Sequence, residues 1–143
     1  MINDNFEKFI EELQRKIEYE EEKKYSKIVI REYRNPNNFG DIENADASGT
    51  VKGPCGDTMK ISLKINNDKI TDAFFWTDGC GATIACGSMI TKILKGISIE
   101  KAADITSEKL TETLEGLPDE HLHCSKLAVD TLKKAIKNYE KKK

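Results

Sequence analysis

Alternation of apolar and polar residues is clearest between Asp57 and Ile65. The hydrophobic positions of this stretch are Met59, Ile61, Leu63 and Ile65. An apolar period of two predicts a strand with one buried face. Weaker patterns of the same kind predict strands over 47–52 and 69–77, and Asn66-Asn67-Asp68 predicts a hairpin turn before the last of them. The three segments therefore predict an antiparallel meander with one apolar face.

Residues 1–24 show a different period, with one apolar stripe at helical spacing. The stripe consists of Phe6, Phe9, Ile10, Leu13 and Ile17. Asp4 and Glu7 have the spacing of a capping box, which predicts a helix start. Because a lone helix of this length is marginal in water, we expect the stripe to pack on its own domain, with docking on a partner as the alternative. Residues 1–24 are thus an N-terminal helical extension to a domain over 25–143.

Further apolar positions at helical spacing predict helices that cover the sheet. Their expected ranges are 82–95, 98–104, 107–114 and 119–143, and 25–33 fits either a short helix or a strand. Ser98 and Ser107 are expected to cap the two short helices, and Gly96 and Pro118 break the chain between elements. The pattern predicts an α+β fold: a three-stranded antiparallel sheet covered by helices, with an extra N-terminal helix.

Composition narrows the class of function. The 143 residues carry a net charge of −2, so no basic surface for nucleic acid is expected. No apolar run is long enough to span a membrane, and the first residues do not form a secretory signal. We therefore expect a cytoplasmic protein with reduced thiols, whose four cysteines are ligands, nucleophiles or core residues rather than disulfides.

Cys80 lies between Gly79 and Gly81, where the third strand is expected to turn into a helix. Glycine allows a positive φ and a close approach of the backbone to a ligand. The dipole of the following helix favours a thiolate over a thiol. This corner predicts a reactive or metal-bound sulfur.

Two other cysteines are also expected at the ends of elements. Cys55 lies in a turn before the central strand, with Asp57 on the same side, and Cys124 follows His123 at the start of the last helix. This placement favours a shared site, although the chain has no Cys-x-x-Cys pair, so separate roles remain open. Asp57 has the alternative of a strand-start residue that binds nearby amides, and His123 either binds metal or orients Cys124.

Four other residues are interpreted as structural. Cys86 is six positions beyond Cys80 on a helix, which turns its side chain away from the corner. We expect it to be small core filler, with a spare thiol as the alternative. His121 is expected to be a surface residue on the first turn of the last helix. Phe74 and Trp76 are expected in the core, with a shielding role for Trp76 as the alternative.

Four short motifs occur in one order along the chain. They are Asn35-Pro36-Asn37-Asn38-Phe39-Gly40, Pro54-Cys55-Gly56-Asp57, Asp78-Gly79-Cys80-Gly81-Ala82 and His123-Cys124-Ser125-Lys126-Leu127-Ala128. In these motifs Tyr25–Tyr139 resembles the iron–sulfur cluster scaffold family, the IscU and NifU N-terminal-type proteins. The resemblance implies a SufE/NifU-like fold. It also implies that Cys55, Cys80 and Cys124 are the metal-binding thiolates and that Asp57 and His123 are accessory ligands.

The resemblance further implies a carrier rather than an enzyme. Such a scaffold receives sulfur from a cysteine desulfurase, with Cys124 as the persulfide acceptor, and takes iron and electrons from an iron donor and a reductant. It builds a labile 2Fe-2S cluster, with a 4Fe-4S cluster as the other form, and passes it to acceptor apoproteins. Zn²⁺ is an expected occupant of the cluster-free form, and the protein is expected as a monomer or homodimer. An oxygen ligand binds iron more weakly than a thiolate does, so Asp57 is the expected release group.

The chain departs from the family pattern at the stretch that a chaperone recognises. The family stretch Leu-Pro-Pro-Val-Lys, which an Hsp70-type chaperone recognises, reads Leu117-Pro118-Asp119-Glu120-His121 here, and we expect weak or absent chaperone docking.

A zinc-bound sulfur-relay protein of the SufU type is the main alternative function, and a structural zinc module is the third. SufU-type relatives usually carry an insertion and a basic residue in place of His123, whereas here 43 residues lie between Cys80 and Cys124.

Overall fold

The computed structural model describes residues 4–142, and its centre is a three-stranded antiparallel sheet in the order β1-β2-β3. The strands are β1 (Ala47–Lys52), β2 (Thr58–Asn66) and β3 (Lys69–Thr77). Ile61 faces Gly49 on one side and Phe75 on the other, so the apolar faces of the strands coincide. The predicted meander is confirmed, with β2 beginning one residue later than expected.

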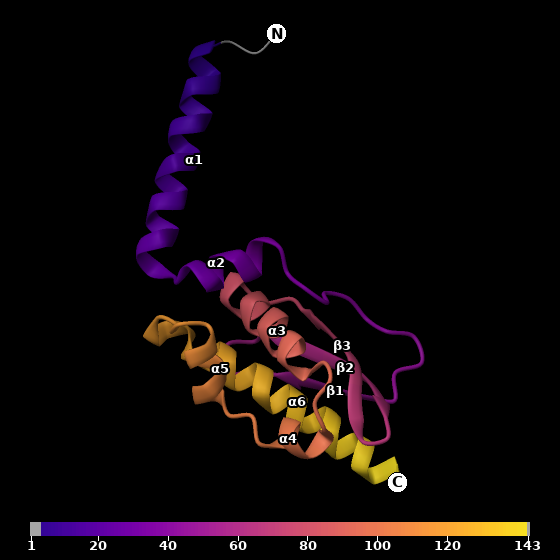
Figure 1. Ribbon diagram of the computed structural model, residues 1–143. Coiled ribbons are helices and arrows are strands. Elements are labelled where there is room, and N and C mark those ends of the chain that lie inside the picture. The colour runs from indigo at the N-terminus through magenta and orange to yellow at the C-terminus, as the bar shows by residue number, and fades with distance from the viewer. Residues whose placement is uncertain (1–3, 143) are drawn as a thin grey trace.

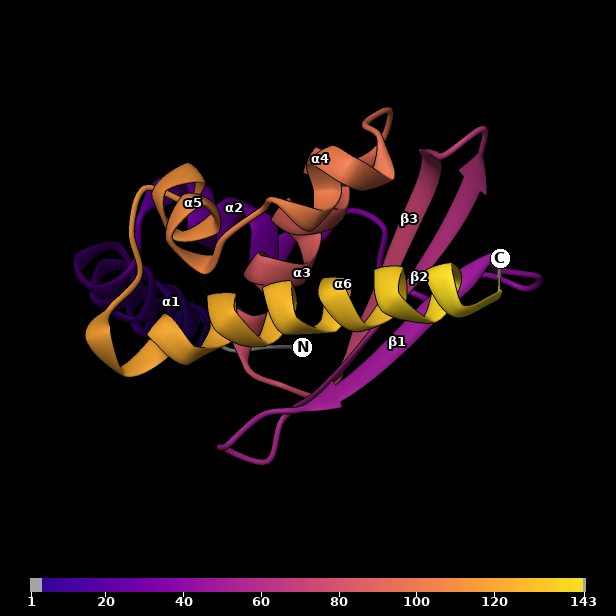
Figure 2. The same cartoon turned by 90° about the horizontal axis from the view of Figure 1, so that it is seen from below.

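Six α-helices and one 3-10 helix are described around this sheet. They are α1 (Asp4–Lys24), α2 (Lys27–Arg34), α3 (Gly81–Leu94), α4 (Ile99–Ala103), α5 (Ser107–Thr113), the 3-10 helix η1 (Asp119–His121) and α6 (Leu122–Lys142). Figures 1 and 2 show α3 and α6 on one face of the sheet, with α2 beyond α3 and the short helices at the side. Ser98 caps α4 as expected, but Thr106 rather than Ser107 caps α5. No helix within this described part is both long and apolar enough to cross a membrane.

Two glycines let the helices approach the sheet closely. A Cβ at Gly49 of β1 would lie 2.5 Å from the backbone nitrogen of Ala135 in α6. A Cβ at Gly87 of α3 would lie 2.3 Å from the ring of Phe75, which is fully buried. Because both contacts leave no room for a side chain, α3 and α6 are fixed in position on the sheet, and each carries part of the site described below.

The aromatic residues of β3 correct one expectation. Phe75 is in the core, Phe74 is only partly buried, and Trp76 is 42% exposed. Side chains alternate between the two faces of a strand, so Phe74 and Trp76 share the face opposite to Phe75. The apolar character of Phe74 and Trp76 wrongly predicted their burial, whereas the alternation of side chains along the strand agrees with their exposure.

Helix α1 is a second correction. It has no buried residue, and Phe6, Phe9, Leu13 and Ile17 of its stripe are exposed. Figure 1 shows α1 projecting away from the rest of the molecule. The other helices already cover the apolar face of the sheet, which leaves no surface of the domain for the stripe. Contacts near its C-terminal end hold α1 in place, notably the ion pairs Arg34–Glu21 and Lys24–Glu120.

Candidate metal centre

Cys80 occupies the predicted corner, directly after β3 and at the N-cap of α3. Its side chain is exposed and makes no capping hydrogen bond, so the sulfur is available. Neither neighbouring glycine has a positive φ. They instead allow close packing: a Cβ at Gly79 would lie 2.8 Å from Oδ2 of Asp57, and one at Gly81 would lie 3.3 Å from the ring of Tyr33. The corner was predicted correctly, but the glycines serve close approach rather than an unusual backbone angle.

Cys124 is the third residue of α6 and is fully buried. Burial raises the pKa of its thiol to about 11, and the neighbouring Cys80 adds to the effect, while a hydrogen bond with Thr83 opposes it. The start of a helix would favour a thiolate, but the raised pKa favours the protonated thiol in the metal-free protein. Loss of solvation outweighs the favourable helix dipole at this position.

His121 departs most from the sequence interpretation. It ends the 3-10 helix η1 rather than lying on the first turn of α6, and its side chain is 17% exposed. Its Nε2 atom lies 3.1 Å from the phenolic oxygen of Tyr25, and its Nδ1 atom is buried without a hydrogen-bond partner among the described residues. Burial lowers the pKa of His121, and the positive charge of Lys24 lowers it further, which favours the neutral imidazole.

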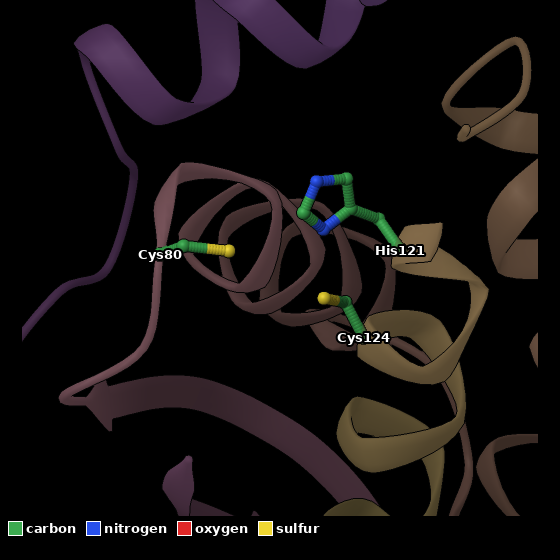
Figure 3. A group of neighbouring side chains, drawn as sticks. All are labelled: Cys80, His121 and Cys124. Carbon is green, nitrogen blue, oxygen red and sulfur yellow. The ribbon is translucent and has the colours of Figure 1, made fainter. Parts of the chain in front are cut away.

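These three side chains meet in one place. Cys80, His121 and Cys124 each offer one ligand atom, and the three atoms lie within 4.8 Å of one another. Figure 3 shows the ring of His121 over the two sulfur atoms, with one ring nitrogen directed toward them. Two thiol groups and an imidazole are ligands that both zinc and iron accept. The donor set therefore fits a metal ion.

The hydroxyl of Thr83 joins the site to Asp57. Thr83 is fully buried, and its Oγ1 atom lies 3.2 Å from Oδ2 of Asp57, 3.3 Å from Sγ of Cys124 and 3.7 Å from Sγ of Cys80. A hydroxyl has one proton, so it donates to only one of these acceptors at a time. Sequence analysis missed Thr83, although a residue three positions beyond Cys80 lies on the same side of the first helical turn.

The remaining predicted ligands lie at the margin of this group. His123 is partly buried, and its Nε2 atom is 3.6 Å from Sγ of Cys124. Cys55 is exposed in the turn between β1 and β2, which closes where the N–H of Gly53 donates to the carbonyl of Asp57. The structure thus brings together Cys80, Cys124 and, through Thr83, Asp57, and it leaves Cys55 outside the compact group.

Cys86 has the structural role that its helical position predicts. It is fully buried in the core, and burial raises the pKa of its thiol well above the ordinary value, with smaller contributions from Cys124 and Cys80. Its sulfur is not among the ligand atoms that converge in the group of Cys80, His121 and Cys124, so Cys86 lies outside that group.

Comparison with known proteins identifies the fold family. The NifU-like N terminal domain matches residues 24–143. The chain is 47% identical over 119 residues to the iron-sulfur cluster assembly scaffold protein IscU 1 of Archaeoglobus fulgidus, covering 82% of this chain and 78% of that protein. It is 44% identical over 124 residues to the scaffold protein IscU of Escherichia coli (strain K12), covering 83% and 96%.

A solved structure agrees with these sequence comparisons. The N-terminal NifU-like protein from Brucella abortus superposes with a TM-score of 0.64 at 21% identity, over 82% of this chain and 95% of that one. At this identity the likeness shows the fold alone. Together with the match over residues 24–143, it confirms the α+β fold that the apolar pattern predicted and the NifU-like fold that the resemblance implied. The chain therefore belongs to the family of NifU-like N-terminal domains.

Proposed function

We propose that this protein is a scaffold on which an iron–sulfur cluster is assembled and from which it is transferred to other proteins. One observation carries the proposal: the thiols of Cys80 and Cys124 converge from separate elements at a point that a carboxylate, Asp57, reaches through a single hydroxyl. The relatives in Archaeoglobus fulgidus and Escherichia coli are described as cluster assembly scaffolds. A soluble carrier of this kind holds the cluster as cargo.

The proposed ligands of the cargo are the thiolates of Cys55, Cys80 and Cys124 with Asp57 as the fourth group. Cys55 is exposed on a turn, so it can approach Cys80 and Cys124 when the cluster forms. Asp57 supplies a harder and more weakly held oxygen, and we propose it as the group that releases the cluster. His123, 3.6 Å from the sulfur of Cys124, is an additional candidate ligand. A 2Fe-2S cluster fits four such groups.

Cys124 remains the proposed persulfide acceptor. Its thiolate would attack the outer sulfur of the desulfurase persulfide, form a new sulfur–sulfur bond and expel the desulfurase thiolate. Because Cys124 is buried and burial raises its pKa to about 11, its sulfur has to become accessible and lose its proton before this step. The exposed Cys55 and Cys80 are the thiols that an incoming donor meets first.

Partner choice is the second part of the proposal. The turn 117–121 is held within the molecule, by the ion pair Lys24–Glu120 and by the contact between Tyr25 and His121. These contacts support weak or absent docking of an Hsp70-type chaperone on this turn. Calorimetric titration with such a chaperone tests this, and tight binding would contradict it.

A zinc-bound sulfur relay of the SufU type is the second candidate. The specific observation in its favour is the compact group of two thiols and one imidazole, which suits Zn²⁺. In that case the protein would pass sulfur on without building a cluster. His123 and the short separation of Cys80 from Cys124 favour the scaffold instead.

One experiment separates the two functions. The metal-free protein and the zinc-loaded protein are each incubated anaerobically with a cysteine desulfurase, cysteine, a reductant and ferrous iron, and visible absorption, zinc, iron and sulfide are recorded. A scaffold develops cluster absorption bands that later appear on an apo-ferredoxin. A relay keeps its zinc while persulfide turns over on Cys124, and this result would overturn the scaffold proposal.

A further inference from the structure

The imidazole of His121 has no assigned role in the proposed scaffold. From the sequence it was expected to be a surface residue, whereas its side chain is 17% exposed. We propose that His121 is a metal ligand through Nδ1, together with Cys80 and Cys124, and that Tyr25 positions its ring. The inference deepens the proposed function and rests on it, because the ion concerned occupies the scaffold thiols when no cluster is bound.

The first argument is the position of Nδ1. This atom is buried and has no hydrogen-bond partner among the described residues. A buried polar atom without a partner costs about 1–3 kcal/mol, so it is rarely left without a purpose. Figure 3 shows a ring nitrogen of His121 directed at the sulfurs of Cys80 and Cys124. Cys80 lies at the start of α3, and Cys124 lies in the first turn of α6.

The second argument is distance. The three ligand atoms lie within 4.8 Å of one another. Tetrahedral zinc with two sulfurs and one nitrogen requires donor atoms about 3.3–3.8 Å apart, from its usual bond lengths. An inward movement of about 1 Å, within reach of side-chain rotation, therefore brings the three atoms to bonding positions.

The third argument is the tautomer. Nδ1 can bind a metal only through its lone pair, so the ring proton has to be on Nε2. The phenolic oxygen of Tyr25 is 3.1 Å from Nε2 and can accept that proton in a hydrogen bond. Tyr25 is itself held edge-to-face against Tyr33, with ring centroids 6.3 Å apart. Partners of this kind fix the orientation of a ligating imidazole.

The backbone of His121 is anchored as well. Its N–H donates to the carbonyl of Pro118 at 2.8 Å, and the preceding Glu120 pairs with Lys24 at 2.8 Å. Lys24 is the last residue of α1, and Tyr25 is the first of the two residues that join α1 to α2. The turn that carries His121 is therefore held by Lys24 and Tyr25, at the junction between α1 and α2. These contacts keep the ring of His121 over the two sulfurs.

The test uses the full-length, metal-free protein labelled with ¹⁵N in its histidine rings. The chain has only two histidines, so long-range ¹H–¹⁵N spectra resolve both rings, and His121→Gln and His123→Gln assign them. On addition of Zn²⁺ we expect Nδ1 of His121 to take the chemical shift of a metal-bound nitrogen, while Nε2 keeps its proton. An unchanged His121 ring, or binding through Nε2, would overturn the proposal.

Zinc affinity, measured by competition with a chelating dye, tests Tyr25. Tyr25→Phe keeps the ring and removes the hydroxyl, and we expect affinity to fall about 10- to 100-fold, as for other outer partners of ligands. Tyr33→Phe is the matched control, because its hydroxyl interacts with Glu21 rather than with His121, and it should change affinity little. Equal losses in the two variants would refute a positioning role for Tyr25.

These measurements need neither iron nor desulfurase, so they are independent of the scaffold assay. A protein that binds zinc through His121 but builds no cluster would refute the proposed function and keep the ligand assignment. A protein that builds and transfers clusters, but whose His121 ring nitrogens keep their chemical shifts when zinc is added, would refute the ligand assignment alone. Circular dichroism of each variant shows whether the fold is retained.

Discussion

Oδ2 of Asp57, at the start of β2, lies 3.2 Å from the hydroxyl oxygen of Thr83, on the first turn of α3. This hydroxyl is also the nearest polar neighbour that Asp57 shares with Cys124 and Cys80. The carboxylate therefore reaches the thiol pair through one rotatable group. Such an arrangement suits a ligand that has to come and go.

Replacement of Asp57 tests its role in release. We expect Asp57→Ala to assemble a cluster and to transfer it to an apo-ferredoxin at least several-fold more slowly, because the weakly held oxygen ligand is gone. Transfer is followed by visible absorption of the acceptor. Asp72→Ala, an aspartate of β3 that pairs with Lys95 instead, is the control. Equal transfer rates for Asp57→Ala and the wild type would exclude a release role.

Gly79→Ala probes the close approach at the corner. The added Cβ would lie 2.8 Å from Oδ2 of Asp57 and 2.8 Å from Cβ of Thr83, so one of these side chains has to move. We expect weaker zinc binding, roughly tenfold, with the secondary structure retained. Gly53→Ala is the matched control, since its Cβ would meet Leu127 at 3.5 Å and the carbonyl oxygen of Asp57 at 3.7 Å, both ordinary contact distances. Equal effects of the two substitutions on affinity would contradict this reading of the corner.

A buried carboxylate makes stability depend on pH. Burial alone would raise the pKa of Glu32, but hydrogen bonds from Ser88, Arg31 and Lys92 outweigh it, and the pKa is lowered from its ordinary value of 4.5. The stabilisation is therefore present above pH 4.5 and is lost as the pH falls through the lower folded-state value.

The corresponding variant is Glu32→Gln, which keeps the shape and cannot ionise. We expect it to lower the free energy of unfolding by about 3 kcal/mol at pH 7, because the side chain is 1% exposed and the positive charges of Arg31 and Lys92 lose their anionic partner. Urea unfolding from pH 7 to pH 3 measures the difference from the wild type, which should shrink below pH 4.5. A difference that stays constant with pH would contradict the assignment, and Glu18→Gln on the exposed face of α1 provides the baseline.

Substitution of two phenylalanines compares the contributions of α1 and of the sheet to stability. Phe9 of α1 is 60% exposed and Phe75 of β3 is fully buried. We expect Phe9→Ala to change the free energy of unfolding by less than about 0.5 kcal/mol and Phe75→Ala to lower it by about 3–5 kcal/mol. Denaturant unfolding of both variants measures this. A large loss in Phe9→Ala would mean that the stripe of α1 is covered in solution.

Local patterns predicted most of the fold. The alternation through Met59 and Ile61 identified β2, and the turn at Asn67 fixed its pairing with β3. The corner at Cys80 followed from a strand pattern that gives way to a helical one. Each of these signals depends on neighbours in the sequence, which is why a single chain was enough to reveal them.

Features that depend on distant packing were not predicted. His121 faces the sulfurs because a 3-10 turn rotates it inward and Tyr25, 96 residues away in sequence, meets it there. Cys124 is held protonated by burial against other elements, which its place in the helix did not reveal. The open stripe of α1 likewise reflects how completely the other helices already cover the sheet.

The junction between α1 and α2 gives the projecting helix a mechanical consequence. With 21 residues α1 is a rigid rod about 30 Å long, and only two residues, Tyr25 and Ser26, separate it from α2. A partner that binds the N-terminal end of α1 would act through the length of the helix on Tyr25. The hydroxyl of Tyr25 contacts the imidazole of His121. A tilt of α1 at this junction would therefore displace the hydroxyl of Tyr25, which lies 3.1 Å from Nε2 of His121.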